Sequence, residues 1–198
     1  EAEDMSQEMV DIYEKGMFEE RGFRKVDFYR LFGIATKEVR KKGDYLKRAG
    51  EQTHQLCYIA NGAGIISRDR SYLGKLTEHD FAGEVEFMRL MTKKDTSSGE
   101  CDDVDNNSKI EHNNIKTIDN SINFTTNQLL QDDNDAVSTN SLSFVANESI
   151  IVESDIVTIY TWDFEELKSY LDTHVLVSNA LLAYISHELR EKLEESWD

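Results

Sequence analysis

The chain has 198 residues, of which 39 are acidic and 22 are basic, so its formal net charge is −17. Proteins that bind nucleic acid or anionic membranes need clustered Lys and Arg, and this composition therefore excludes a general binder of either polyanion. No window approaches the ~18 consecutive apolar residues of a membrane-spanning helix, and two cysteines, Cys57 and Cys101, cannot form a disulfide framework. We expect a soluble domain in a reducing compartment.

A change of composition divides the chain. Segment 96–142 contains nine Asn and seven Asp but few large apolar residues. Such a segment cannot bury enough apolar surface to offset the entropy of ordering it, and we predict a disordered, acidic, Asn-rich insert. The remaining residues form a core over 10–94 and 149–198 that is large enough for one domain. The prediction is therefore a single domain over 1–198 that the insert interrupts.

Before the insert, the predicted elements are helices followed by strands. Apolar residues recur at spacings of three and four within 4–33, which predicts two short amphipathic helices. Within 37–87, short β-rich runs are separated by Gly or polar turns, the spacing of a meandering antiparallel sheet. A strand-like run follows Gly62-Ala63-Gly64, so we interpret this turn as a hairpin rather than a dinucleotide-binding loop.

After the insert, two β-rich runs at 149–152 and 156–161 precede a return of the helical period from Asp163 onward. In the last helix an apolar stripe is expected to pack on the sheet, or alternatively to cover a ligand or a second subunit; it contains Leu182, Ile185, Leu189, Leu193 and Trp197. Strands of this kind avoid open edges by closing or doubling their sheet. The predicted fold is therefore mainly β with flanking α: a jelly roll (double-stranded β-helix) of about eight antiparallel strands with N-terminal helices and C-terminal helices.

One motif points to a ligand. Segment 43–62 contains Gly-Asp-Tyr-Leu-Lys-Arg-Ala-Gly-Glu and then Leu-Cys-Tyr-Ile-Ala-Asn-Gly, and it resembles the opening strands of the cyclic nucleotide-binding domain family. Segment 81–88, Phe-Ala-Gly-Glu-Val-Glu-Phe-Met, resembles the family's phosphate-binding cassette, in which Gly-Glu precedes a short helix and an Arg stands before the next strand. The resemblance implies that Gly83 lies against a cyclic phosphate and that Glu84 binds the ribose 2′-hydroxyl.

The cassette lacks the Arg of ordinary family members. Nine residues beyond Glu84 stands Lys93, which supplies charge without the bidentate fork of Arg, so any affinity should be lower. The predicted ligand site consists of Gly83, Glu84, Val85, Glu86 and Lys93, with cAMP as the ligand and with no cofactor and no metal. Two alternatives stay open: the Gly-Glu pair is a surface turn, and the lysine is the exposed end of a helix.

The flanks resemble a narrower family, the Popeye domain of membrane-anchored, cAMP-responsive proteins. Segment 12–32 is similar to its N-terminal helices, and Trp162 with 167–193 is similar to its last strand and C-terminal helices. Popeye domains also lack the cassette Arg; of their Asp-Ser-Pro-Glu-Phe only Glu-Phe at 86–87 is present here, and their later Phe-Gln-Val-Thr is not recognisable. The resemblance implies pairing through 163–198 and a cytoplasmic-facing domain that segments outside this chain tether to a membrane.

Two functions follow from these observations. The first is a non-catalytic regulatory module that binds cAMP and signals through its C-terminal helices. The second is a structural or assembly domain without a ligand, which forms a homodimer or docks with a partner protein through 163–198. An enzyme is disfavoured, because the sequence contains no nucleophile motif, acid–base set or metal-ligand spacing.

Overall fold

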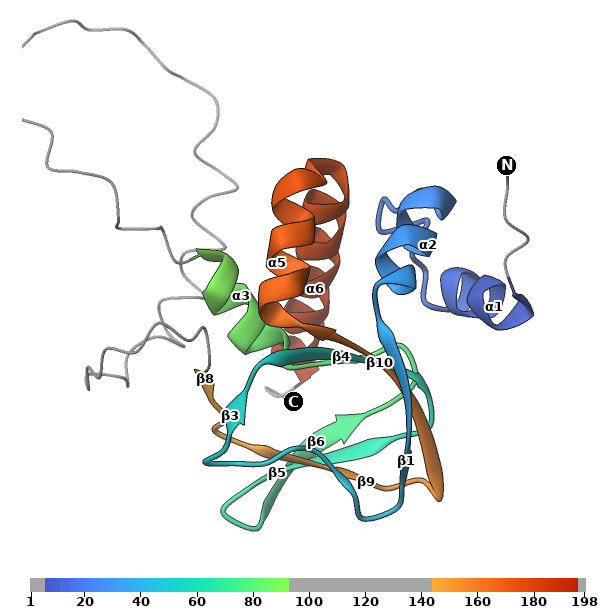
Figure 1. Cartoon of the computed structure of the whole chain (residues 1–198). Helices are drawn as coiled ribbons and strands as arrows, with labels where there is room; N and C mark the ends of the chain where they lie inside the picture. The colour runs from blue at the N-terminus through green and yellow to red at the C-terminus, as the bar shows by residue number, and fades with distance from the viewer. Residues whose placement is uncertain (1–5, 93–143, 196–198) are drawn as a thin grey trace, which may run out of the picture. The chain divides into compact units, whose positions relative to one another are not determined.

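The computed structural model describes residues 6–92 and 144–195 (Figure 1). The predicted insert at 96–142 and Lys93 lie outside these residues. The elements, in chain order, are α1 (Gln7–Lys15), α2 (Lys25–Gly33), β1 (Thr36–Lys41), β2 (Tyr45–Lys47), β3 (Gln52–Thr53), β4 (Gln55–Asn61), β5 (Gly64–Arg68), β6 (Ser71–Leu76), β7 (Phe81–Ala82), α3 (Glu84–Thr92), β8 (Phe144–Val145), β9 (Ser149–Val152), β10 (Ile156–Asp163), α5 (Phe164–Thr173) and α6 (Val175–Glu195). The predicted order of helices, strands and helices is confirmed.

The strands form the two antiparallel sheets of a jelly roll, as predicted. One sheet has the order β1-β10-β4-β7 and the other has the order β2-β9-β5-β6, while the two-residue strands β3 and β8 pair separately. Most consecutive strands therefore lie in different sheets. The predicted hairpin at Gly62 is wrong, because this turn joins β4 in one sheet to β5 in the other. Gly62 has a φ of +100°, and a Cβ atom there would lie 2.9 Å from the Ile156 carbonyl oxygen.

The helices gather at one end of the roll (Figure 1). There α3, α5 and α6 contact one another, and α2 contacts α6. Helix α5 begins at a sharp boundary after β10, because the Asp163 carboxylate accepts hydrogen bonds from the backbone N–H groups of Glu165 and Glu166, at 2.9 and 3.2 Å. None of the described helices is long and apolar enough to span a membrane.

Aromatic side chains join the helices to the strands. The ring of Phe81 on β7 lies 5.1 Å from that of Tyr58 on β4 and 5.5 Å from that of Tyr184 on α6, measured between centroids. The indole N–H of Trp162 on β10 donates to the Leu31 carbonyl of α2 at 2.8 Å. Edge-to-face pairs of this kind stabilise a core by about 0.5–1.5 kcal/mol each beyond area burial. The strand that leads into the cassette therefore shares one core with the C-terminal helix.

Candidate functional site

The predicted cassette is a tight turn between β7 and α3. Gly83 has a φ of +85°, a left-handed conformation that favours glycine. A Cβ atom at this position would lie only 2.6 Å from the Gln55 carbonyl oxygen of β4. The Phe87 N–H donates to the Gly83 carbonyl at 3.0 Å and closes the first turn of α3. Glycine is thus required here both by the backbone conformation and by the close approach of the neighbouring strand.

Glu84, the predicted acceptor for a ribose hydroxyl, is bound by α6. Its Oε1 accepts a hydrogen bond from Lys192 Nζ at 3.0 Å, and its side chain is 13% exposed. Lys192 also donates to the Phe81 carbonyl at 3.1 Å and pairs with Glu188 Oε1 at 2.8 Å. Burial on its own would lower the pKa of Lys192, but the carboxylates of Glu84 and Glu188 outweigh burial and raise it. Lys192 is therefore a fully charged group at the cassette.

Glu188 binds the same part of β7 from one helical turn away. Its Oε1 accepts a hydrogen bond from the Phe81 N–H at 2.8 Å, while its Oε2 is buried with no hydrogen-bond partner among the described residues. Burial raises the pKa of Glu188 to about 7; Lys192 opposes this shift and Glu84 adds to it. Two α6 side chains thus bind the N–H and the carbonyl of a single residue. We call Glu188, Lys192 and their contacts to Phe81 and Glu84 the α6 clamp.

Glu86 belongs to a second ionic cluster, on the other side of the cassette. Its Oε1 accepts from Lys47 Nζ of β2 at 2.9 Å, and the same Nζ donates to Glu148 Oε1 at 2.8 Å. The side chains of Lys47 and Glu86 are only 5% and 6% exposed, and Arg68 pairs with Glu148 Oε2 at 3.4 Å. Burial alone would lower the pKa of Lys47, but Glu86 and Glu148 outweigh it and raise that pKa. Val85, the other described member of the predicted site, is half-buried.

A polar hollow of 110 Å³ lies beside this cluster. Lys47, Arg48 and His54 line it, together with Gln55, whose carbonyl oxygen approaches Gly83. Ordinary small-molecule sites enclose about 300–1,000 Å³. The hollow has room for a phosphate-sized anion or a few waters at about 30 Å³ each. A whole cyclic nucleotide fits only if protein side chains move.

The residue that precedes the next strand of the main sheets is acidic. That strand is β9, and the residue directly before it is Glu148. The family resemblance placed an Arg before the next strand, and the count along the chain led to Lys93, which lies outside the described residues. Among the residues that the structure does describe, this position carries a carboxylate, and Lys47 of β2 supplies the neighbouring cation.

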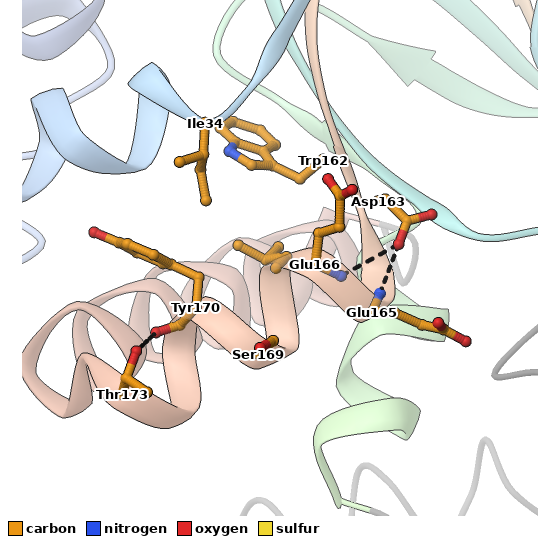
Figure 2. Close-up of a pocket in the computed structure, with 9 residues that line it drawn as sticks. Ile34, Trp162, Asp163, Glu165, Glu166, Ser169, Tyr170 and Thr173 are labelled. Carbon is orange, nitrogen blue, oxygen red and sulfur yellow. Dashed lines mark hydrogen bonds between the residues drawn. The ribbon is translucent and has the colours of Figure 1, made fainter.

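A larger hollow of 620 Å³ lies between α5 and the end of α2. Figure 2 shows Ile34 and Trp162 together on one side of it, Tyr170 on α5 across from them, and Asp163 at the start of α5. Ile34 is 44% exposed, and the Tyr170 hydroxyl is buried without a hydrogen-bond partner in the described part of the chain. Three of the lining residues are acidic and none of those described is basic, so this groove is unsuited to a phosphate. It offers an apolar surface with an acidic border.

Comparisons with known proteins bear on the fold. Neither a family model nor a curated protein matches the sequence. Solved structures do match. PKAR CBD2 bound to Sp-2Cl-cAMPS aligns at 10% identity and a TM-score of 0.53, over 93% of this chain and 86% of that one. The fold is that of cyclic nucleotide-binding domains.

Two further matches share this fold. The c-di-GMP responsive global regulator CLP of Xanthomonas campestris aligns at 13% identity and a TM-score of 0.55, over 87% of this chain and 61% of that one. The regulatory subunit of a cAMP-independent protein kinase A from Trypanosoma brucei aligns at 12% identity and a TM-score of 0.50, over 84% and 42%. This chain thus spans less than two thirds of either protein. The three proteins are named for different responses, so the shared fold leaves the ligand open.

Neither ionic cluster was predicted from the sequence. Glu188 and Lys192 are four residues apart, a spacing that ordinarily indicates an exposed ion pair along a helix. A signal was present, however, because the two residues continue the spacing of Val177, Leu181 and Tyr184, all buried in the structure. Of the predicted apolar stripe, only Ile185 is fully buried among the side chains that the structure describes. The buried face of α6 is therefore rotated from the one we predicted, and it ends in charged residues.

Proposed function

We propose that this chain is a non-catalytic regulatory module that binds a cyclic nucleotide, cAMP, at the cassette and signals through α5 and α6. The observation that carries the proposal is the bond between Glu84 and Lys192 of α6. A nucleotide whose ribose hydroxyl uses Glu84 must share or replace that bond. Binding is then linked to the position of α6, because a ligand shifts an equilibrium by its differential affinity for two arrangements.

In this proposal the cassette residues keep the roles that the resemblance implies. The phosphate lies at the N-terminus of α3, where Gly83 permits close approach and Val85 and Glu86 form the first turn. Glu84 binds the ribose hydroxyl, and Lys93 supplies the charge that the cassette Arg supplies in ordinary family members. The module requires no cofactor or metal for this function.

The proposal includes the Popeye-type assignment. It is supported by two helices before the roll, α1 and α2, by Trp162 on the last strand, and by the helix pair α5 and α6 that follows. An acidic residue instead of Arg before β9 also fits a cassette that works without the usual fork. The assignment adds a homodimer through 163–198 and a membrane tether in segments outside this chain.

Titration with a fluorescent cAMP analogue tests the proposal. We expect the wild-type protein to bind, and Glu84→Gln to bind about 10-fold or more weakly, because a hydrogen bond to a charged group contributes about 1.5–3 kcal/mol. Glu165→Gln, an exposed change of the same charge on α5, is the matched control and should leave the affinity unchanged. Saturation that is identical in all three proteins, or no binding at millimolar analogue, would refute the assigned site.

The second candidate is an assembly domain without a ligand. Two observations favour it: the Lys47 cluster leaves only 110 Å³ beside the cassette, and the helical end of the roll exposes apolar residues. Val175 and Leu176 at the start of α6 are 63% and 67% exposed. Two adjacent, strongly exposed apolar side chains at the start of a helix favour a contact with another protein.

Light scattering separates the two candidates. For an assembly domain we expect a dimer or hetero-complex whose mass does not change with cAMP and falls in Leu176→Asp. Leu73→Asp is the matched control, because Leu73 is also an exposed leucine, at 52%, but it belongs to strand β6 rather than to α6. A wild-type monomer, or a loss of mass that is the same in both variants, would exclude a homodimer through α6.

A further inference from the structure

The α6 clamp uses all the bonding capacity of one ammonium group. Lys192 Nζ contacts Glu84 Oε1 at 3.0 Å, Glu188 Oε1 at 2.8 Å and the Phe81 carbonyl oxygen at 3.1 Å. A lysine ammonium has three N–H donors, and three acceptors are present. Glu84 Oε1 is one of these three acceptors, so a ribose hydroxyl that donates to this oxygen competes with Lys192.

We propose that Lys192 is an internal competitor of the ligand: it sets the affinity of the cassette by holding Glu84, and its displacement releases the end of α6. This inference rests on the proposed function, since it concerns the same carboxylate. It differs from the usual expectation for a cation near an anionic ligand. A free lysine would attract the phosphate and raise affinity, whereas a committed lysine must first be detached and lowers it.

The released segment has a defined beginning. Tyr184 anchors the middle of α6, because its hydroxyl donates to the Gly16 carbonyl at 2.8 Å and its ring packs on Phe81. Beyond Tyr184, Glu188 and Lys192 bind α6 to β7, and Lys192 also binds it to α3. Detachment should therefore loosen 188–195 while 175–184 stays packed, as expected when local stability varies along one helix.

The acidic groups around the α6 clamp lose a bound cation when Lys192 detaches, and this loss favours release of the end of α6. A cleft of 540 Å³ between α6 and the β6–β7 turn is lined by four acidic residues and by two lysines: Asp80, Glu188, Glu191, Glu194, Lys75 and Lys192. Without Lys192, the buried carboxylates of Glu84 and Glu188 have no bound cation between them, so ionising both is unfavourable and the pKa of Glu188 rises further. The raised pKa of Glu188, about 7, has the same origin in burial and in the nearby Glu84.

Lys192→Met tests this role, with Lys168→Met as the matched control. Both lysines have side chains that are 26% exposed and pair with a carboxylate four residues away, but Lys168 on α5 pairs with Asp172 and does not contact the cassette. We expect Lys192→Met to bind the fluorescent cAMP analogue about 10-fold more tightly than the wild type, and Lys168→Met to stay within about 2-fold. Hydrogen exchange measured on the same proteins without nucleotide should be faster at 188–195 in Lys192→Met only.

Glu84→Gln provides a second variant with a different signature. It replaces the carboxylate with a neutral amide and so weakens the bond to Lys192, and exchange at 188–195 should also rise. It also makes the ligand's acceptor weaker, so nucleotide affinity should fall. Weaker or unchanged binding by Lys192→Met overturns the competitor role. Unchanged exchange at 188–195 in both variants overturns the clamp. Absence of binding in every protein refutes the proposed function and the competitor role together, whereas the exchange result still decides whether the clamp holds α6.

Discussion

Replacing Lys47 with Met should destabilise the protein far more than loss of a surface ion pair. Lys47 lies at the end of a three-residue strand, yet its side chain is 5% exposed and binds Glu86 and Glu148, which are 6% and 23% exposed. Removing one partner of a buried pair leaves uncompensated charge and costs about 3–5 kcal/mol. Lys75 is the control: it pairs with Glu153 at 2.6 Å, but the two side chains are 45% and 39% exposed, and such pairs contribute about 0–1 kcal/mol.

Urea denaturation of the two variants at pH 7 measures the difference. We expect the free energy of unfolding to fall by about 3 kcal/mol or more in Lys47→Met and by less than about 1 kcal/mol in Lys75→Met. Burial alone would raise the pKa of Glu148, but Lys47, together with Arg68, outweighs burial and lowers it. In Lys47→Met that pKa should rise, so the folded state takes up a proton in mild acid and the deficit should shrink as the pH falls. Equal losses in the two variants would show that the Lys47 cluster is not a buried network.

Three further changes test the geometry around the cassette. In urea denaturation, Gly83→Ala should destabilise the protein by about 2 kcal/mol more than Gly43→Ala. Both glycines have a φ near +85°, but only at Gly83 does the added Cβ lie 2.6 Å from a carbonyl oxygen. Equal losses of stability in the two variants would contradict this close approach. Glu188 has a folded-state pKa of about 7, above its ordinary 4.5. The free energy of unfolding of the wild type should therefore fall by up to about 3 kcal/mol as the pH rises from 5 to 8, and that of Glu188→Gln should fall less. Parallel plots of stability against pH for the two proteins would disprove this role of Glu188. Tyr184→Phe removes the 2.8 Å bond to the Gly16 carbonyl and should lower the thermal midpoint through a loss of about 1–3 kcal/mol; an unchanged midpoint would mean that the hydroxyl does not anchor α6.

The elements of this fold could be predicted from the sequence because their signals are local. The helical period marks α1, α2, α5 and α6, and glycine turns separate the strands before the insert. The pairing of the strands was harder to predict from the sequence. Strand β10 pairs with β1 and β4, which lie far before it in the chain, with Tyr160 opposite Lys37 on one side and Tyr58 on the other. No local pattern encodes that choice, and the turn at Gly62 therefore looked like a hairpin although it crosses between sheets.

The site could be predicted only where one segment forms it. The Gly83 turn and the start of α3 follow from a motif of a few residues, and the structure has the expected turn there. The partners of that segment come from elsewhere: Lys192 from the last helix, Lys47 from a distant strand and Glu148 from beyond the insert. Counting along the chain led to Lys93, whereas the residue that precedes the next strand is Glu148. Sequence distance fails as a guide to charge placement when an insert separates two strands that are consecutive in the core.

The clamp also sets a quantitative limit on sensing. If a nucleotide binds only when Lys192 is detached, its apparent affinity equals the intrinsic affinity reduced by the fraction of detached molecules. A tenfold gain in Lys192→Met then means that at most about 10% of wild-type molecules are detached without ligand. The same bond that weakens binding makes the response of α6 large, because a mostly detached helix would have little left to release. Weak affinity and effective signalling are therefore linked consequences of one lysine. A mutation that raises the nucleotide affinity by removing Lys192 should reduce the response of α6.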